Sequence, residues 1–514
     1  MFMLGREKIQ AELTDTEAFC AKLLKPGSVY EFLANHRREL FADEHFVDLY
    51  PSGTGRPSVP ASRVASIMVL QILEGLSDRE ALEQVRSNLY WKMALGVPLD
   101  YEGFSPNVLT LWRNRIAASQ APNRIFDIVA QVVAGTGLIR SRNKRALDST
   151  VLGDAVATQD TFTQIVAQIR RVRRAIPALS QVELTAGFDY GSKDRKPDID
   201  YSDEAERSRA LTELIGDANA LIQASESLDL SQSEQEAIGL LALVAGQDVE
   251  IVDEVTGRFA IATKVARDRV VSVVDPASRH AHKSRRVYLD GYKGHISVEP
   301  DTEVVTKTAF TKGNQGDAAS AKALLDAEKE PVVVYGDTGY SSAQLRGDLQ
   351  REGHAAVIKC HPLSMAVPGG FSIDDFEVDE GAGVLTCPAG NTAPISAKGR
   401  ASFERHCAGC PLRERCTRSK RGRVVTIDSA YLINRSARRH FADPAVRADY
   451  NANRPTVERI HAQMKRKMNS AKVRYRGIAK NAMYYSAIAA TWNLRVLLRN
   501  GLTRHGGQWV LAPG

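Results

Sequence analysis

Residues 331–342 read PVVVYGDTGYSS, and this stretch decides how the middle of the chain folds. Its unbroken apolar run is typical of a strand that is buried on both faces of a sheet. The run ends at Asp337, so a carboxylate is expected at the carboxyl end of that strand. Gly339, two residues later, permits a tight turn at which the backbone and a ligand can come close.

The neighbouring segments predict a mixed sheet around this strand. Three stretches before it alternate with a period of two, as strands do: 269–274, 286–299 and 303–313. Two helical patterns and one further apolar strand flank or follow it: 316–329, 341–353 and 354–360. Antiparallel strands followed by alternating helices and strands indicate an α/β core.

At 514 residues the chain exceeds what one hydrophobic core normally supports, so several domains or insertions are expected. The patterns divide it into a helical N-terminal domain, a first core strand, a helical insertion, the main core, a cysteine-rich insertion and a C-terminal pair of helices: 1–135, 143–155, 156–265, 266–360, 361–443 and 444–514. In the first of these, a helix over 104–119 carries Arg113 and Arg115. This helix either contacts DNA in a helix-turn-helix or belongs to a plain helical bundle.

The net charge is +7, from 68 Lys and Arg against 61 Asp and Glu, and it is unevenly distributed. Basic residues gather at 140–145, 170–174, 418–423 and 454–476, whereas 198–254 is acidic. Basic patches of this kind fit a polyanion, and duplex DNA is the first candidate. No apolar run reaches about eighteen residues, so no membrane span is expected. Six cysteines in so long a chain indicate a reducing cytosol and no disulfide scaffold.

A helix is predicted from Pro455 onwards, within the stretch YNANRPTVERIHAQMKRKM (450–468). Apolar residues recur along it at helical spacing: Val457, Ile460, Met464 and Met468. Four polar residues share a neighbouring face because they fall four, three and four apart: Arg454, Glu458, His461 and Lys465. Glu458 is either an ion-pairing residue of a solvated helix or a functional carboxylate.

Three carboxylates are candidates for one site: Asp148, Asp337 and Glu458. Asp148 lies within the apolar strand 145–152, where an acid is unfavourable unless it binds a partner. Converging carboxylates repel each other unless a divalent cation lies between them, and oxygen ligands suit Mg²⁺, with Mn²⁺ as a substitute. Alternatively, Asp148 bonds backbone amides and Asp337 caps the following turn.

Rival carboxylates exist at four other positions: Asp154, Asp160, Asp290 and Asp317. Of these, Asp290 precedes Gly291, and an Asp-Gly pair favours a hairpin turn. We therefore expect Asp290 to be a structural residue.

Asp148, Asp337-Thr-Gly-Tyr340 and Arg454-x3-Glu458-x6-Lys465 together resemble the motif set of bacterial insertion-sequence DDE transposases. The resemblance implies an RNase H-like α/β core with a mixed sheet. It also implies that the three acids bind two Mg²⁺ ions, while the Arg and Lys of the last motif contact transposon-end DNA.

The similarity extends along nearly the whole chain. Residues 275–296 resemble the strand pair between the first two acids, and the N-terminal helical segment is similar to the N-terminal domain of the family. One spacing differs: the family usually has two residues between its Tyr and Arg, and three separate Tyr450 from Arg454 here.

The resemblance implies a DNA transposase that cleaves and joins strands at element ends by two-metal chemistry. It further implies a homodimer on double-stranded transposon-end and target DNA, in the cytoplasm of a bacterium and associated with the nucleoid. Two alternatives remain open: a catalytically inactive, sequence-specific DNA-binding repressor, and an RNase H-type nuclease without joining activity. His461 is a proton carrier, a DNA contact or a polar residue without a role in the reaction.

Four of the six cysteines lie within thirty residues of one another: Cys387, Cys407, Cys410 and Cys416. A C-x2-C pair with two further thiols in a cytosolic protein favours a tetrahedral structural Zn²⁺ site. An insertion this small has little core of its own, so metal binding would supply folding free energy. His406 is an alternative ligand, and reduced structural thiols are the alternative to zinc.

Overall fold

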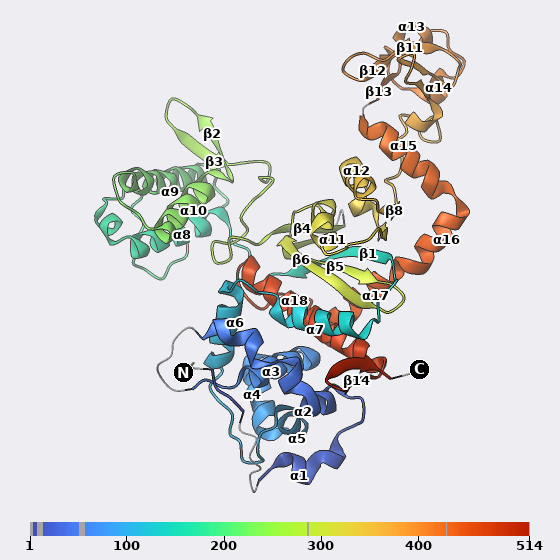
Figure 1. Ribbon diagram of the computed structural model, residues 1–514. Helices are drawn as coiled ribbons and strands as arrows, with labels where there is room; N and C mark the ends of the chain where they lie inside the picture. Colours follow the sequence, from blue (N-terminus) through green and yellow to red (C-terminus); the bar gives the residue numbers. More distant parts are fainter. Residues whose placement is uncertain (1–3, 8–13, 51–56, 285–286, 428, 513–514) are drawn as a thin grey trace.

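The computed structural model of the protein describes residues 4–7, 14–50, 57–284, 287–427 and 429–512. A mixed sheet lies at the centre, with a helical bundle from the N-terminal part of the chain against it (Figure 1). Two bodies project from this centre: a helical insertion, and a small cysteine-rich module at the end of a helical arm (Figure 1). The mixed α/β architecture expected from the sequence is confirmed.

The central sheet has one antiparallel half and one parallel half. Its strands are β1 (Lys144–Gly153), β4 (Arg279–Ser284), β5 (Val287–Glu299), β6 (Val304–Lys312), β7 (Val333–Gly336) and β8 (Ala355–Ile358). Their order is β4-β5-β1-β7-β8, and β6 also pairs with β5. β5 is antiparallel to β1, β4 and β6, whereas β1, β7 and β8 are parallel. Short helices connect the strands: η4 (Asp317–Ser320), α11 (Ala321–Leu325), η5 (Thr338–Tyr340) and α12 (Ala343–Arg351).

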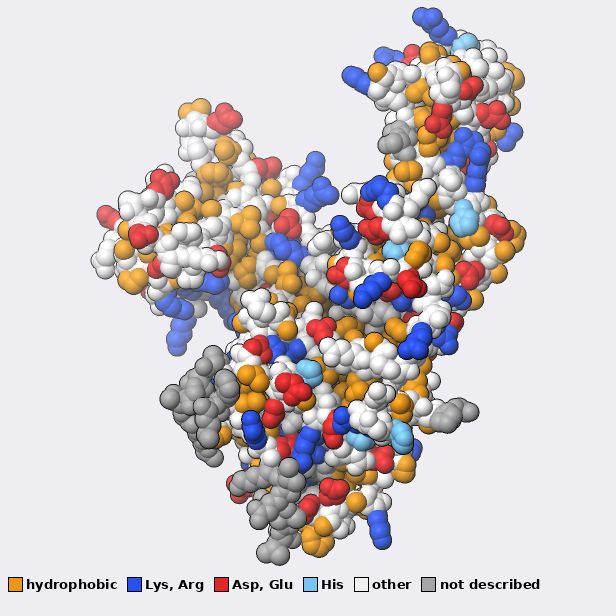
Figure 2. Space-filling view, viewed as in Figure 1, with side chains coloured by type: hydrophobic (Ala, Val, Ile, Leu, Met, Phe, Trp, Pro, Cys, Tyr) orange, Lys and Arg blue, Asp and Glu red, His pale blue; other side chains and the backbone are white. Residues whose placement is uncertain are grey.

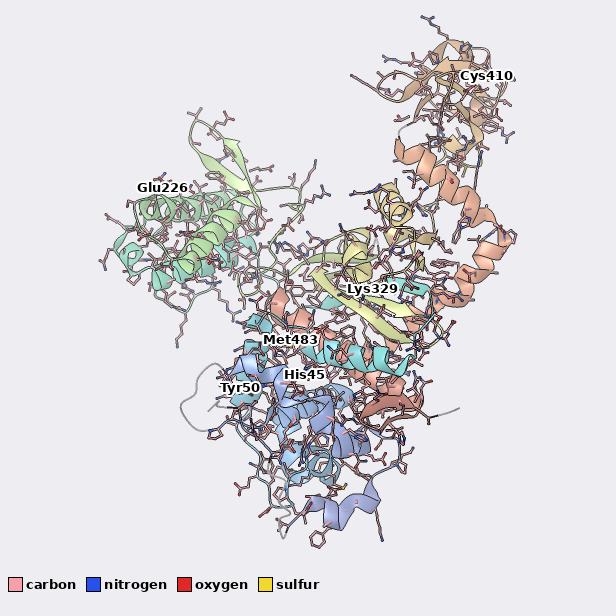
Figure 3. All side chains as sticks on the ribbon, viewed as in Figure 1. His45, Tyr50, Glu226, Lys329, Cys410 and Met483 are labelled. Carbon is pink, nitrogen blue, oxygen red and sulfur yellow. The ribbon has the colours of Figure 1, made fainter. Side chains whose placement is uncertain are left out.

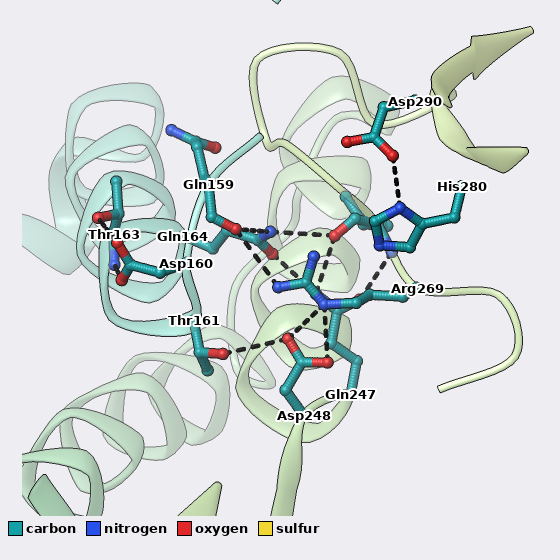
Figure 4. A network of polar contacts seen from close by, with 11 residues as sticks. Gln159, Asp160, Thr161, Thr163, Gln164, Gln247, Asp248, Arg269, His280 and Asp290 are labelled. Carbon is teal, nitrogen blue, oxygen red and sulfur yellow. Dashed lines mark hydrogen bonds and ion pairs between the residues drawn. The ribbon is translucent and has the colours of Figure 1, made fainter. Parts of the chain in front are cut away.

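Two local expectations for this region are wrong. Residues 269–274 form no strand, because the amide side chains of Gln164 and Gln247 bind the backbone of Val270. Its N–H donates to Gln247 Oε1 at 2.9 Å, and its carbonyl accepts from Gln164 Nε2 at 3.0 Å. Figure 4 shows both amides within one network of polar contacts. Asp290 and Gly291 lie within β5, paired with β4, and form no hairpin turn.

The N-terminal bundle consists of helices, as expected. They are α1 (Thr16–Cys20), η1 (Ala21–Leu23), α2 (Val29–Leu40), η2 (Asp43–Leu49), α3 (Ala61–Glu74), α4 (Asp78–Ser87), α5 (Leu89–Leu95), α6 (Asn107–Ala118) and α7 (Arg124–Thr136). Ser77 and Glu80 form a capping box at the start of α4.

The helix α18 (Ile478–Arg499) joins this bundle to the sheet. It packs against β6 on one side and against α3, α6 and α7 on the other, and Met483 in its second turn is 1% exposed (Figure 3). One hydrophobic cluster therefore runs from the bundle through α18 into the sheet. A hairpin of β14 (Leu502–His505) and β15 (Gln508–Leu511) follows and contacts α7.

The helical insertion lies between β1 and β4 in the chain and has a hydrophobic core of its own. It contains α8 (Thr161–Ala175), η3 (Pro177–Gln181), α9 (Glu204–Ser225), α10 (Gln232–Gly246) and the hairpin of β2 (Val249–Asp253) and β3 (Arg258–Ile261). The hairpin is the part that the helical patterns did not predict.

The second insertion separates β8 from the last helices of the core. Its module contains η6 (Ile373–Asp375), β9 (Glu377–Asp379), β10 (Val384–Thr386), β11 (Thr392–Pro394), β12 (Arg400–Ser402), α13 (Glu404–Cys407), α14 (Arg413–Cys416) and β13 (Val424–Thr426). The chain returns along the arm through α15 (Ser429–Ala442) and α16 (Pro444–Asn453) and enters α17 (Pro455–Lys467) beside the sheet (Figure 1). Within the described ranges, every helix is too short or too polar to cross a membrane.

Candidate active site

Asp148 and Asp337 lie on neighbouring parallel strands. Ala146 of β1 pairs with Tyr335 of β7, so the two acids each lie two residues further along their strands in the same direction. Asp337 directly follows β7, and its Oδ1 accepts a hydrogen bond of 2.8 Å from the N–H of Gly339. The turn-capping role that the sequence left open for Asp337 is therefore real. This hydrogen bond engages one of the two carboxylate oxygens of Asp337. The carboxylate lies at a sheet edge where ligands are commonly held.

The helix α17 brings Glu458 to the same place. It begins at Pro455, and its apolar stripe is buried as predicted: Val457 and Ile460 are 0% exposed and Met464 is 2% exposed. Because this stripe faces the core, the neighbouring polar face lies along β1. Lys465 Nζ donates to the carbonyl of Val151 in β1 at 2.8 Å, which fixes the far end of the helix.

The Arg454 guanidinium lies between Asp148 and Glu458. Its Nη2 is 2.8 Å from Asp148 Oδ1, and its Nη1 is 3.3 Å from Glu458 Oε1. Burial alone would lower the pKa of Arg454, but the charges of Asp148, Asp337 and Glu458 raise it above the ordinary value. The Arg454 side chain is 3% exposed, whereas that of Glu458 is 65% exposed. Glu458 thus approaches the site from the solvent side.

The carboxyl group of Asp148 is electrostatically unfavourable in its present surroundings. Burial raises its pKa to about 7; the Arg454 charge opposes this shift, and the charges of Asp337 and Glu458 reinforce it. Among the residues that the structure describes, no three His, Cys, Asp or Glu side chains are arranged as a metal-binding group. The donor set is nevertheless one of carboxylate oxygens near one another, which is the chemistry that Mg²⁺ requires.

His461 lies beside Asp148, inside the protein. Its Nε2 is 4.0 Å from Asp148 Oδ2, and its side chain is 6% exposed. Burial lowers its pKa to about 3, so the imidazole is neutral at physiological pH. A direct DNA contact by His461, one of the roles considered from the sequence, is contradicted by this burial.

Comparison with known families assigns the chain. Residues 386–498 match the family described as "Transposase DDE domain", and residues 20–115 match the one described as "Transposase domain (DUF772)". Both matched families are transposase families, and together they support an insertion-sequence DDE transposase. Its mixed sheet is accordingly the RNase H-like core of that family.

The two matches cover different parts of the transposase. Glu458 and the four clustered cysteines lie within 386–498, whereas Asp148 and Asp337 precede this range. The roles of these two aspartates therefore rest on the sheet geometry and not on the family match.

Other comparisons add little. No curated protein matches the chain. A cryo-EM structure of the piggyBac transposase synaptic complex with hairpin DNA is 12% identical, with 73% of each chain covered and a TM-score of 0.23. A likeness at that score supports no conclusion.

One acid near the site of the transposase received no role from the sequence. A Cβ atom on Gly339 would lie 2.7 Å from Asp317 Oδ2 and 3.0 Å from Asp337 Oδ1, so both carboxylates border the same glycine. Asp317 also forms an ion pair of 2.8 Å with Lys293 of β5. From the sequence, Asp317 is only one of four rival acids. Its position at the start of η4 does not indicate that it lies beside Asp337.

A buried hydroxyl lies among these acids. Tyr340 is 0% exposed, and its hydroxyl has no hydrogen-bond partner among the described residues. Burial raises its pKa, and the charges of Asp317, Asp148 and Asp337 raise it further. Asp317 therefore belongs to the same electrostatic environment as the two predicted strand acids.

The remaining residues predicted to contact DNA lie in different environments. Arg113 of α6 is 3% exposed, is ion-paired with Asp78 and stacks on Tyr475 with 5.1 Å from guanidinium carbon to ring centroid. Its expected DNA contact is contradicted, because packing of the bundle encloses it. Arg115 is exposed, with its guanidinium carbon 5.5 Å from the centroid of the Tyr50 ring. Arg454 is also enclosed, so a direct grip on phosphate by its guanidinium is not available in this structure.

Tyr450 lies in α16 and is half-buried. Its ring packs edge-on against Phe441 of α15, with 5.2 Å between centroids. The extra residue before Arg454 thus coincides with the junction between α16 and α17, where Asn453 ends one helix and Pro455 begins the next.

Proposed function

We propose that this transposase cleaves phosphodiester bonds at the ends of its own element and joins the freed 3′-OH to target DNA. Asp148, Asp337 and Glu458 are the proposed catalytic residues. The observation that carries the proposal is that one guanidinium contacts Asp148 and Glu458 and feels the charge of Asp337. These acids come from two neighbouring parallel strands and a helix that are far apart in the sequence. A set of mutually repelling carboxylates that includes a largely buried member such as Asp148 is typical of functional sites.

The same three residues are the proposed ligands of Mg²⁺, with Mn²⁺ as its substitute in assays. When bound, a pair of such ions activates the attacking oxygen and stabilises the leaving oxygen of an in-line displacement. Arg454 draws Asp148 and Glu458 together through the two ends of its guanidinium, so α17 stays aligned with β1. His461 is neutral and lies behind Asp148, where it separates this carboxyl group from the protein interior.

Double-stranded DNA at the element ends and at the target is the proposed partner, bound by a homodimer of the transposase in the bacterial nucleoid. Lys465 is half-buried beside Val151 at the rim of the site, and Arg466 and Lys467 follow it in exposed positions. Cations at this end of α17 are placed to attract phosphate. Arg115 is the remaining candidate contact from the N-terminal bundle.

Neither alternative function is favoured by a specific observation. A repressor without catalysis would have no use for a carboxylate as enclosed as Asp148. A nuclease without joining activity would differ from the proposal only in its products.

The decisive experiment compares Asp337→Asn with the unchanged protein on duplexes that carry the element ends, in Mg²⁺. We expect strand cleavage to be abolished while end binding is largely retained, because the amide keeps the shape but loses the charge. Asp229→Asn is a matched control, since Asp229 is exposed in the helical insertion. Normal cleavage by Asp337→Asn would contradict the site, and cleavage without joined products would favour the nuclease.

A further inference from the structure

The four clustered cysteines surround one small cavity. We call residues 371–427 the Cys module; Cys410 marks it in Figure 3. Its cavity of about 20 Å³ is lined by Cys387, Cys407, Cys410 and Cys416 together with apolar rings and His406. That volume holds about one water-sized occupant. All four thiols are free and lie outside any disulfide.

Two separate turns bring the thiols together. Cys387 follows β10 and begins a tight turn, in which Gly390 N–H donates to the Cys387 carbonyl at 2.8 Å. Gly390 has a φ of +81°, which a residue with a side chain rarely adopts. The other three cysteines come from α13, the turn after it and the end of α14. Two segments that lie about twenty residues apart in the chain thus meet at the cavity.

Polar hydrogens point at two of the sulfur atoms. The N–H of Arg423 donates to Cys407 Sγ at 3.5 Å, and Asn391 Nδ2 donates to Cys387 Sγ at 3.8 Å. Hydrogen bonds to sulfur favour the thiolate over the thiol, and groups of this kind usually surround metal ligands. Gly422 allows the first of these contacts, since a Cβ there would lie 3.3 Å from Cys407 Sγ and 2.9 Å from Glu404 Cα.

The module has little else to hold it together. Its strands are three residues long, and two of the cysteines, Cys407 and Cys416, are themselves members of its hydrophobic cluster. A body of this size seldom folds stably on apolar burial alone. The thiols share a cavity without forming a preassembled metal-binding group among the described residues, so a ligand would have to draw them inward.

We infer that the Cys module binds one structural Zn²⁺ through Cys387, Cys407, Cys410 and Cys416. Four thiolates in a tetrahedron are a preferred zinc environment, and each thiol releases its proton to solvent on binding. The ion adds to the small hydrophobic core of the module. It also anchors the arm, because Tyr431 and Arg438 of α15 bond to Ile373 and Asp374 of the module.

The test measures metal in the full-length protein, purified without chelator. We expect one zinc per chain by elemental analysis, and loss of that zinc in the double variant Cys407→Ser/Cys410→Ser. Cys20→Ser and Cys360→Ser are matched controls, because both cysteines lie outside the cavity; the Cys360 thiol is 3.3 Å from Arg346 Nη2. The controls should retain full zinc. Zinc retained by the double variant would overturn the assignment.

A second measurement holds even if the double variant fails to fold. After chelation, the unchanged protein is titrated with Co²⁺, and we expect the intense absorption that several thiolate ligands give. His406→Asn should leave both the zinc content and this absorption unchanged. Loss of either in His406→Asn would show that the histidine replaces a cysteine as ligand. A protein without zinc that also fails to bind Co²⁺ would overturn the inference entirely.

Discussion

Arg454 donates a hydrogen bond of 2.8 Å to Asp148, which lies 306 residues earlier in the chain. The same guanidinium faces Glu458, so one buried cation lies between two carboxylates that are proposed to share a metal. This relationship explains why α17 lies against β1. A buried cation of this kind makes the strand, the helix and the site depend on one another.

Arg454→Met should destabilise the transposase, because it leaves Asp148 in the interior without its counter-charge. We expect the free energy of unfolding to fall by about 3 kcal/mol, measured by denaturant titration. Arg459→Met is the control on the same helix: Arg459 pairs with Glu303 at the surface and is 52% exposed, so its loss should cost under about 1 kcal/mol. Equal costs for the two variants would contradict a structural role for the Arg454 ion pair.

Gly339→Ala should impair catalysis without preventing DNA binding. The added Cβ would lie 2.7 Å from Asp317 Oδ2, so the turn that holds Asp337 must shift. We expect cleavage to fall by about tenfold to a hundredfold, as a displacement of about 1 Å near reacting groups can cause. Gly347→Ala in α12 is the matched control, since its nearest contact is the flexible end of Arg351 at 3.4 Å. A variant at position 339 that cleaves normally would show that the turn tolerates the shift.

Asp317→Asn tests whether the acid beside Gly339 supports the reaction. Because Asp317 shares the environment of Asp148 and Asp337, we expect cleavage in Mg²⁺ to decrease while overall folding is preserved. The comparison is Asp326→Asn, which removes the more exposed ion pair between Asp326 and Lys307. If both variants lose activity equally, the effect comes from ion pairing in general and Asp317 has no special place.

Arg113 and Arg115 should behave differently when each is replaced. Arg113→Met should lower the stability by about 2 kcal/mol, because Asp78 loses its buried partner. Arg115→Ala should leave stability nearly unchanged, and if Arg115 contacts a phosphate it should reduce the salt dependence of end binding by about one unit of slope. Binding isotherms at several salt concentrations distinguish the two. An unchanged slope for Arg115→Ala would remove the bundle helix α6 from the DNA interface.

Much of the fold followed from local patterns. The apolar run before Asp337 became β7, and the spacing of Val457, Ile460 and Met464 became the buried stripe of α17. Each of these features depends on residues that are close together in the chain. The spacing of apolar residues is therefore enough to predict it.

Other features were decided by contacts between distant segments. Residues 269–274 have a strand-like pattern. However, the backbone N–H and carbonyl of Val270 are hydrogen-bonded to the side chains of Gln247 and Gln164 and not to a neighbouring strand. Arg454, Glu458 and His461 share one polar face of α17. Arg454 and His461 are buried beside Asp148 of β1, whereas Glu458 is exposed. This difference depends on how α17 packs against the sheet.

The sequence by itself determined which acids could form the site, that the core is a mixed α/β sheet, and that four cysteines form a group. Only the tertiary structure decided that a guanidinium separates Asp148 from Glu458, that Asp317 borders the same turn as Asp337, and that α18 unites the N-terminal bundle with the sheet. The physical reason is the distance along the chain over which each signal acts. Periodicity shows which residues of one segment avoid water. Whether a charge is buried, or a core is shared, depends on which distant segments pack against that segment.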